Sequence, residues 1–141
     1  MTTLPVMWGQ QDAFGHVNNV EYLKWAETAR VEYLLRIGQM PDLPPAGIAP
    51  IVASIKCDYR RVVNYPDNIR VGTRVTRIGN SSFQMEHRIV SESLGDIVAE
   101  VDSTLVTLDY GAGKPVRVPD ETRKLIGELE GASLEELSQA G

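Results

Sequence analysis

The feature that most constrains how this chain folds is a run of alternating apolar and polar residues that extends, with three short interruptions, from Ile51 to Leu108. Alternation puts successive side chains on opposite faces of an extended backbone, so it is typical of strands with one buried face. The interruptions hold turn-forming residues and span Asn64–Asn68, Gly79–Ser81 and Leu94–Asp96. Connections this short join antiparallel neighbours, because parallel strands need a long crossover. The sequence therefore predicts four consecutive antiparallel strands, the first of them half-buried.

The segment before these strands has a helical period. Apolar residues recur every three to four positions between Val20 and Ile37, which predicts an amphipathic helix of about five turns. Asn18 and Glu21 have the spacing of a capping box, and Gly38 is expected to end the helix. The apolar stripe of this helix consists of Tyr22, Leu23, Ala26, Ala29, Tyr33, Leu34 and Ile37.

Two shorter elements complete the expected fold. Residues 4–8 are expected to form a short strand, and a second helix is expected to follow the cap residue Asp120. Prolines and a glycine make residues 41–50 a connector rather than a helix. We predict an α+β fold with a five-stranded antiparallel sheet wrapped around one long helix, because only one long helix is available to cover the sheet. This domain is expected to span residues 1–131, followed by a short tail over residues 132–141.

Composition narrows the class of protein. The net charge of −5 argues against a general nucleic-acid binder, and no apolar run reaches the roughly 18 residues of a membrane span. Cys57 is the only cysteine, which excludes an internal disulfide, and the N-terminus lacks a signal-peptide pattern. Two histidines and one cysteine form no cluster with metal-ligand spacing. We therefore expect a cytoplasmic protein with no nucleic-acid, membrane or metal partner.

Charge is unevenly distributed along the chain. Residues 56–88 contain seven basic and three acidic residues, a balance of +4 within a chain of net charge −5. This basic segment is either a docking surface for an anionic ligand or a solvated face of the sheet. Both interpretations are open at this point.

The stretch immediately before the long helix concentrates polar chemistry. Asp12, Gly15, His16, Asn18 and Asn19 fall within eight residues and lead into the positive end of that helix. Backbone N–H groups there lack helical partners and can stabilise negative charge. A carboxylate beside free amide donors is what acyl-transfer chemistry needs. Asp12 is therefore the leading catalytic candidate, and its alternative role is that of an ordinary turn residue.

The same stretch resembles a family signature. The sequence DAFGHVNNVEYL over residues 12–23, followed by ETAR over residues 27–30, is similar to that of the hotdog-fold acyl thioesterases of the 4-hydroxybenzoyl-CoA thioesterase family. The first run also resembles plant acyl-carrier-protein thioesterases. The resemblance implies a hotdog fold and active sites at the subunit interfaces of a homodimer or homotetramer. It also implies no metal and no cofactor, with CoA only as part of the acyl-CoA substrate.

The resemblance assigns roles within the loop. It implies that Asp12 is the catalytic carboxylate and that the backbone N–H of Asn19 polarises the thioester carbonyl. Whether Asp12 acts as nucleophile or general base is left open. His16 is a third candidate. Three roles are open for it: orienting Asp12, hydrogen-bonding the thioester, or bracing the loop. Many relatives carry a second acid two residues before the catalytic one, where this chain has Gln10.

Substrate contacts are implied in the loop, in the basic segment and after the turn at Gly79. They are Gly15, Val17, Asn18, Arg60, Arg61, Ser81 and Ser82. Asn18 is also expected to cap the helix. Arg70, Arg74 and Arg77 are further candidates for phosphate contacts.

Three titratable residues outside the loop are interpreted as structural. Glu27 and Arg30 have the i,i+3 spacing of an ion pair on a helix surface. His87 lies in one of the alternating segments and is expected to be a structural residue of its strand.

The predicted function is hydrolysis of an acyl-CoA thioester to a carboxylic acid and CoA. Two alternatives are open: a thioesterase for acyl-carrier-protein substrates, and a non-catalytic hotdog protein that binds acyl-CoA. The sequence does not choose the length of the acyl chain, an aromatic or aliphatic preference, or dimer over tetramer.

Overall fold

The computed structural model describes residues 1–39, 47–131 and 137. Of the connector expected over residues 41–50, residues 41–46 lie outside the described residues, and the expectation is wrong for residues 48–50, which begin a strand. The elements follow one another as β1 (Thr2–Pro5), a 3-10 turn (Trp8–Gln10), α1 (Asn19–Arg36), β2 (Ile48–Tyr59), β3 (Asn68–Ile78), β4 (Ser82–Ser91), β5 (Asp96–Asp109), β6 (Lys114–Pro115) and α2 (Asp120–Glu130).

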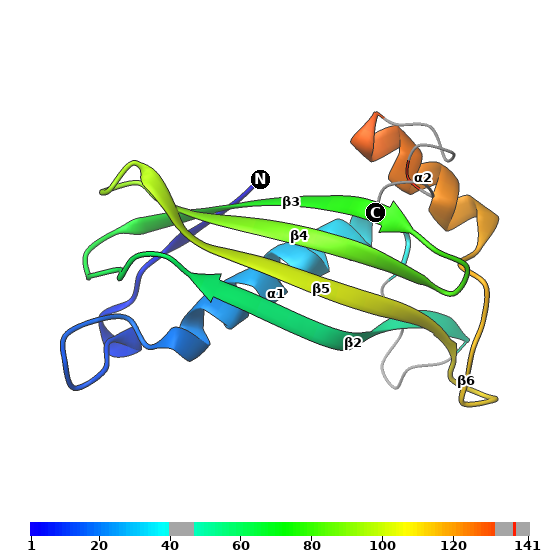
Figure 1. Ribbon diagram of the computed structural model, residues 1–141, viewed down its shortest axis with the longest axis horizontal. Coiled ribbons are helices and arrows are strands. Elements are labelled where there is room, and N and C mark those ends of the chain that lie inside the picture. The colour runs from blue at the N-terminus through cyan, green and yellow to red at the C-terminus, as the bar shows by residue number, and fades with distance from the viewer. Residues whose placement is uncertain (40–46, 132–136, 138–141) are drawn as a thin grey trace. The chain divides into compact units, whose positions relative to one another are not determined.

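The sheet has the order β1-β3-β4-β5-β2, and β6 pairs with β5 (Figure 1). Strand β1 runs antiparallel to β3 with Thr2 opposite Val71. An α+β arrangement with an antiparallel sheet and one long helix is the expected hotdog fold. Two details of the prediction are wrong. The first strand ends at Pro5 rather than Trp8, because residues 8–10 turn into a 3-10 helix, and the two-residue β6 was not expected.

Contacts divide the chain into two compact units, and α1, β2, β3, β4 and β5 each contribute to both. Unit 1 consists of Met1–Glu32, Lys56–Thr73 and His87–Asp102, and unit 2 of Tyr33–Ile55, Arg74–Glu86 and Ser103–Gly141. The boundary between a domain over 1–131 and a tail stays a prediction. Within the tail, Leu137 is described, and it is buried in the core of unit 2.

Each unit has its own hydrophobic core. In unit 1 the buried side chains of α1 are Tyr22, Trp25, Ala26 and Ala29, and they belong to one cluster with Ile69, Val71, Ile89, Val98 and Val101. In unit 2 Tyr33, Leu34 and Ile37 belong to a cluster with Val75, Phe83, Met85, Leu105 and Ile126. Two alanines on the stripe of α1 are fully or almost fully buried. Small side chains let a helix approach a sheet closely, which is why the stripe tolerates no bulk there.

Strand β2 departs from its prediction. It begins at Ile48, three residues before the alternation. From Ile51 to Tyr59 the residues on both faces are exposed, apart from the half-buried Cys57, whereas one buried face was expected. Its apolar members Ile48, Ile51, Val52, Ile55 and Tyr59 are 39–48% exposed. β2 is also the last strand of the sheet order, so among the described residues only one of its edges is paired with another strand.

The two ends of α1 are capped as predicted, except for one hydrogen bond of the capping box. The Val20 N–H donates to Asn18 Oδ1 at 3.0 Å, so Asn18 caps the helix, and Gly38 ends it with a φ of +67°. The reciprocal half of the capping box does not form, because the Glu21 carboxylate bonds Gln10 Nε2 and Lys24 Nζ instead.

Two predicted charge roles are wrong. Arg30 is 5% exposed, so it does not lie on the helix surface where an ion pair with Glu27 was expected, although the Glu27 charge still favours its protonated form. Among the described residues, its Nε and Nη2 atoms are buried without a hydrogen-bond partner. Asp120 is the first residue of α2 rather than its cap, which is Pro119, and its carboxylate pairs with Arg117 at 2.5 Å. In the part of the chain that the structure describes, no helix is long and apolar enough to cross a membrane. The cytoplasmic location stays a prediction.

Candidate functional site

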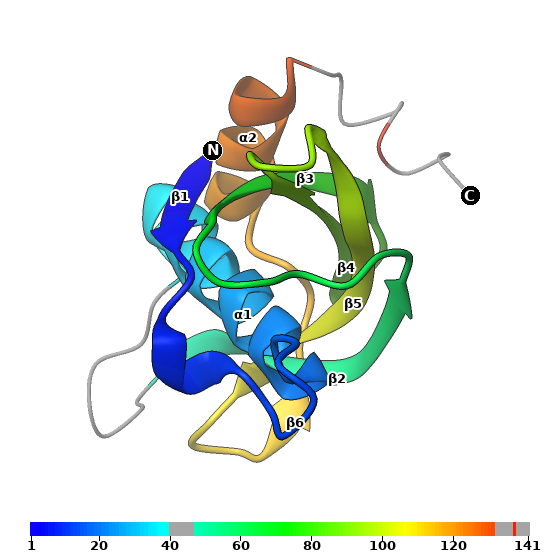
Figure 2. The ribbon, with the colours of Figure 1, turned by 90° about the vertical axis from the view of Figure 1, so that its left-hand side faces the viewer.

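The polar loop before α1 is a tight hairpin in unit 1 (blue, Figure 2). Gln11 and Val17 form an isolated antiparallel bridge across its base. The Asp12 N–H donates to the His16 carbonyl at 2.7 Å, and the Gly15 N–H donates to the Asp12 carbonyl at 3.1 Å. Gly15 has a φ of +78°, a conformation that side-chain-bearing residues rarely adopt. The tight turn of the loop therefore depends on a glycine at this position.

The Asp12 carboxylate is fixed by its own loop. Its Oδ1 accepts hydrogen bonds from the N–H groups of Phe14 at 2.8 Å and His16 at 3.3 Å. Among the hydrogen bonds of residues 1–39 and 47–131, none engages Asp12 Oδ2. Asp12 and the His16 ring are exposed. One oxygen thus holds the position of the carboxylate, and the other is available to react.

The backbone between the loop and α1 is held on both sides. Val17 is buried, and its N–H donates to the Val63 carbonyl at 2.9 Å. The Asn18 N–H donates to the Gln10 carbonyl at 2.9 Å. In the described parts of the chain the N–H of Asn19, the first residue of α1, has no acceptor. An unpaired amide at a helix N-terminus is a ready donor to negative charge.

The presence of Gln10, where many relatives have an acid, has a structural explanation. Its Oε1 accepts from the Met7 N–H at 2.7 Å, and its Nε2 donates to Glu21 at 3.1 Å. The side chain therefore ties the 3-10 turn to the first turn of α1. A carboxylate in its place has no N–H to offer Glu21, so the amide suits this position better than the acid found in many relatives.

A pocket of about 280 Å³ opens beside the start of α1. It is lined by Val17, Asn19, Tyr22, Tyr59, Arg60, Arg61 and Val62, all in unit 1. Four of these, Val17, Asn19, Arg60 and Arg61, were predicted from the sequence. Asp12, Gly15, His16 and Asn18 lie in the adjoining loop and not in the wall of the pocket. Sequence reasoning missed Tyr59 and Val62, and it treated Tyr22 only as a core residue.

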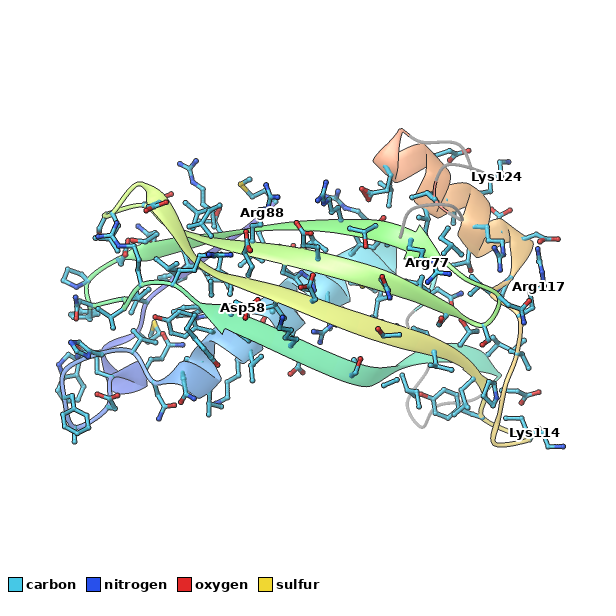
Figure 3. The ribbon with its side chains drawn as sticks, viewed as in Figure 1. Asp58, Arg77, Arg88, Lys114, Arg117 and Lys124 are labelled. Carbon is cyan, nitrogen blue, oxygen red and sulfur yellow. The ribbon has the colours of Figure 1, made fainter. Side chains whose placement is uncertain are left out.

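The candidate phosphate contacts are engaged in ion pairs. Arg60 pairs with Glu100 at 2.7 Å and Arg61 with Asp96 at 3.3 Å. Further along the sheet, the pairs are Arg70–Glu92, Arg74–Glu86 and Arg88–Glu100. Arg88 projects from β4, and Arg77, which is also exposed, projects from β3 (Figure 3). Much of the basic segment is therefore a solvated sheet face whose charges are neutralised by ion pairs. This agrees with the second of the two interpretations of that segment given above.

Ser81 and Ser82 belong to unit 2, at the turn that precedes and begins β4. The Ser81 carbonyl accepts from the Thr107 N–H at 2.7 Å. The site described above lies within unit 1, so the contribution of these serines to substrate binding stays a prediction.

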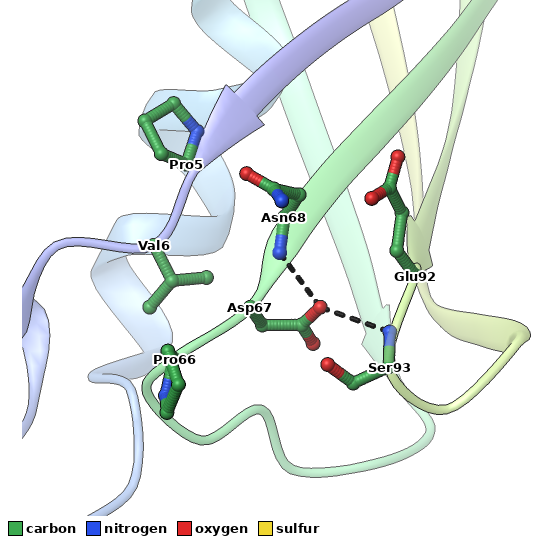
Figure 4. A pocket seen from close by; sticks show the side chains of 7 residues that line it. All are labelled: Pro5, Val6, Pro66, Asp67, Asn68, Glu92 and Ser93. Carbon is green, nitrogen blue, oxygen red and sulfur yellow. Dashed lines mark hydrogen bonds between the residues drawn. The ribbon is translucent and has the colours of Figure 1, made fainter.

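A second cavity of about 370 Å³ lies between the end of β1, the start of β3 and the β4–β5 turn, within unit 1 (Figure 4). Two carboxylates line it, those of Asp67 and Glu92. Asp67 accepts from the N–H groups of Asn68 at 2.7 Å and Ser93 at 3.0 Å and from the Ser91 hydroxyl. Partial burial opposes ionisation, but these hydrogen bonds from Ser91 and Ser93 hold the pKa of Asp67 below its usual value. Asp67 thus fastens a turn, and Glu92 pairs with Arg70 at 2.8 Å, so we do not place the catalytic centre in this cavity.

His87 is fully buried on β4, with Nδ1 at 2.9 Å from the Thr73 hydroxyl, which agrees with the structural role expected for it. Burial and the nearby Arg30 charge lower the pKa of His87 to about 4, so it is neutral at pH 7. Across the described ranges, no group of three or more His, Cys, Asp or Glu residues is arranged to hold a metal ion.

Comparison with known proteins agrees with this geometry. A family model described as the thioesterase-like superfamily matches residues 6–126. The chain is 26% identical to the long-chain acyl-CoA thioesterase FadM of Escherichia coli, over 91% of this chain and 97% of that protein. It is 28% identical to the acyl-CoA thioesterase YbgC of Haemophilus influenzae, over 89% and 92% of the two chains.

A solved structure extends the comparison. A thioesterase of Thermus thermophilus, complexed with coenzyme A and Zn, is 34% identical and has a TM-score of 0.80 over 94% of this chain and 96% of that one. The matched residues include the Asp12 loop, the whole of α1 and the pocket beside its first turn. With its hotdog fold and its match over residues 6–126, the chain belongs to the thioesterase-like superfamily.

Proposed function

We propose that this protein is an acyl-CoA thioesterase. The observation that carries the proposal concerns one short hairpin. Among the described residues, its Asp12 Oδ2 has no hydrogen-bond partner, and the hairpin leads directly to the N–H of Asn19, which has no acceptor there. A pocket lined in part by Asn19 opens at the same helix end. Two relatives similar over about nine-tenths of the chain carry the name acyl-CoA thioesterase, which supports the same activity here.

The proposed chemistry uses the loop as follows. The Asn19 N–H donates to the thioester carbonyl oxygen and stabilises its negative charge as the tetrahedral intermediate forms. Asp12 Oδ2 either attacks the carbonyl carbon or removes a proton from the water that does so. The C–S bond then breaks, and CoA leaves as a thiolate that takes up a proton. If Asp12 acts as a general base, the oxygen of the attacking water is retained in the carboxylic acid. If Asp12 acts as the nucleophile, the acyl group stays on Asp12 as a mixed anhydride, and a water molecule then hydrolyses it to the carboxylic acid and frees Asp12. His16 is proposed as a brace, because it bonds Asp12 through its backbone.

For the CoA end, Arg60 and Arg61 are the proposed phosphate contacts, because both line the pocket. Each now pairs with an exposed carboxylate. Exposed pairs contribute at most about 1 kcal/mol, so a phosphate can replace Glu100 or Asp96 as the partner without a large energetic loss.

The direct test is thiol release from acyl-CoAs with short, long and aromatic acyl groups. We expect turnover of at least one class, and the ranking of kcat/KM across the panel identifies the preferred acyl group. The same acyl groups on an acyl carrier protein form a second arm. Faster release from the carrier favours the carrier-protein alternative. Binding of acyl-CoA without any thiol release contradicts the proposal and favours the non-catalytic alternative.

We further propose that a second copy of the chain covers β2. The strand is twelve residues long, ends the sheet order and exposes Ile48, Ile51, Val52 and Ile55. A long apolar edge strand in a soluble protein calls for a partner. Self-pairing satisfies both the backbone edge and the apolar side chains, and it closes the assembly with one symmetric interface.

Replacing Ile51 and Ile55 by Lys is expected to convert the oligomer to monomer. Burial of two half-exposed isoleucines contributes roughly 3 kcal/mol, so their loss raises the dissociation constant by about a hundredfold or more. Sedimentation velocity over a range of protein concentrations measures the change. Leu94→Lys, at a residue 41% exposed in the β4–β5 turn, is the matched control and should leave the oligomer intact. A wild-type protein that is monomeric throughout this range refutes the interface.

A further inference from the structure

The peptide group between Asn19 and Val20 is held from two directions. The Tyr59 hydroxyl of β2 donates to the Asn19 carbonyl at 2.9 Å, across 40 residues of sequence. On the other side of the same peptide, the Val20 N–H donates to Asn18 Oδ1 at 3.0 Å. The first turn of α1 is thus fixed by a side chain from a distant strand as well as by its own cap.

Tyr59 is itself held in position. Its ring packs edge-to-face against Tyr22, with centroids 5.1 Å apart and an interplanar angle of 77°. The Tyr22 hydroxyl donates to the Arg61 carbonyl at 3.1 Å and accepts from the Val63 N–H at 3.1 Å. The two tyrosines therefore make different hydrogen bonds. Tyr59 bonds the first turn of the helix, and Tyr22 bonds the backbone of the segment that forms the pocket wall.

Tyr59 is a permanent donor at physiological pH. Partial burial and the hydrogen bond with Cys57 raise the pKa of Tyr59 to about 12, so the hydroxyl keeps its proton. The Tyr59 hydroxyl donates to the carbonyl of Asn19. The N–H of Asn19, at the pocket end of the helix, is attached to the same Cα. The Asn19 N–H shares its peptide plane with the Asn18 carbonyl, which accepts from the Glu21 N–H at 3.0 Å. The Asn19 carbonyl bound by Tyr59 belongs to the next peptide plane of the same turn. Tyr59 therefore acts on the direction of the Asn19 N–H by holding the turn to which both planes belong.

We propose, on the basis of the proposed thioesterase activity, that Tyr59 is a positioning residue, which holds the first turn of α1 so that the Asn19 N–H stays aimed at the thioester carbonyl oxygen. Stabilisation of an oxyanion depends on a donor that is already oriented when charge develops. A donor that swings by tens of degrees loses much of its hydrogen bond, since alignment weakens steeply at low angles. Tyr59 therefore acts on the transition state more than on substrate binding.

The test compares Tyr59→Phe with Tyr22→Phe, which remove one hydroxyl each from the same aromatic pair. Tyr59→Phe is expected to lower kcat about tenfold with KM within twofold of wild type, as for one lost hydrogen bond that matters in the transition state. Its affinity for a non-hydrolysable thioether analogue of acyl-CoA should be unchanged, because that analogue has no carbonyl to polarise. Tyr22→Phe should instead change KM and thermal stability and leave kcat within about twofold. Tyr65→Phe, at an exposed tyrosine outside the site, controls for loss of a hydroxyl.

Amide exchange separates this inference from the activity on which it rests. In Tyr59→Phe, deuterium uptake of a peptide covering residues 17–23 should be faster than in wild type and in Tyr65→Phe. If Tyr59→Phe has the kcat of wild type, or if it changes only KM, the inference is wrong. If wild type cleaves no thioester, the proposed activity fails, and unchanged exchange in Tyr59→Phe then overturns the positioning role as well.

Discussion

Replacing Asp12 by Asn is expected to lower kcat of thioester hydrolysis by at least about a hundredfold, with KM within a few-fold of wild type. Asparagine keeps the size of the side chain, and its carbonyl oxygen can still accept from the Phe14 and His16 N–H groups that fix Asp12 Oδ1. The loop is therefore preserved, while the second oxygen becomes an amide nitrogen that neither attacks a carbonyl nor takes a proton from water. Losses of this size accompany removal of a general base or nucleophile. Thiol release at saturating acyl-CoA measures the effect.

The chain offers a matched control for Asp12. Asp109 Oδ1 accepts from the Gly111 N–H at 2.9 Å and the Ala112 N–H at 3.2 Å, so it closes a turn in the way that Asp12 Oδ1 closes its loop. Asp109→Asn should leave kcat unchanged. Equal activity of Asp12→Asn and wild type contradicts the proposed mechanism. If Asp12→Asn loses activity as expected, mass spectrometry of wild type quenched during the first turnover distinguishes the two roles of Asp12, because an acyl adduct on its peptide identifies a nucleophile.

Acidification from pH 7 to pH 4 is expected to remove about 3 kcal/mol of stability through His87 alone. The pKa of His87 is about 4 in the folded protein, because burial and Arg30 disfavour its charged form, against about 6.5 for an unfolded histidine. The folded-state pKa is the lower one, so the unfolded state takes up the proton first as the pH falls. The contribution is fully present above pH 6.5 and is lost as the pH falls toward 4. Urea denaturation at both pH values measures it.

The comparison needed is with His87→Gln, which keeps a polar group beside Thr73 but does not titrate. Carboxylates titrate in both proteins, so their effects cancel in the difference. The free energy of unfolding of wild type should fall by about 3 kcal/mol more than that of His87→Gln between pH 7 and pH 4. His16→Gln removes the other histidine, which is exposed, and controls for the loss of a histidine as such. Parallel loss of stability in wild type and His87→Gln means that the buried site does not titrate as described.

Local sequence rules predicted most of the fold. Alternation marked four strands, a period near 3.6 marked α1, and Gly38 marked its end, because each signal depends only on neighbours in the chain. Burial of β2 could not be predicted, because alternation does not reveal which strand lies at the edge of a sheet. Arg30 was misread for a related reason: its spacing from Glu27 fits an ion pair, but its side of the helix faces the core of unit 1.

The site likewise has a part that local sequence patterns predict and a part that they do not. Asp12, Gly15, His16 and Asn19 are contiguous, so their loop could be recognised from sequence alone. Tyr59 reaches Asn19 across 40 residues, and Arg60 reaches Glu100 across the same separation. Contacts of this kind depend on the order of strands in the sheet, which no local pattern records. The sequence identified the candidate loop, and the structure added the contacts with distant side chains that hold the start of α1.

The place of β2 in the sheet has a consequence for biosynthesis. β2 ends at Tyr59, but β5, the strand it pairs with, begins only at Asp96. At about 5–20 residues per second, the ribosome needs about 2–7 s to make the intervening segment. During that time an apolar twelve-residue strand has no partner in its own chain. The strand carries two charged residues, Lys56 and Asp58, and charges on an edge strand oppose edge-to-edge pairing with other chains.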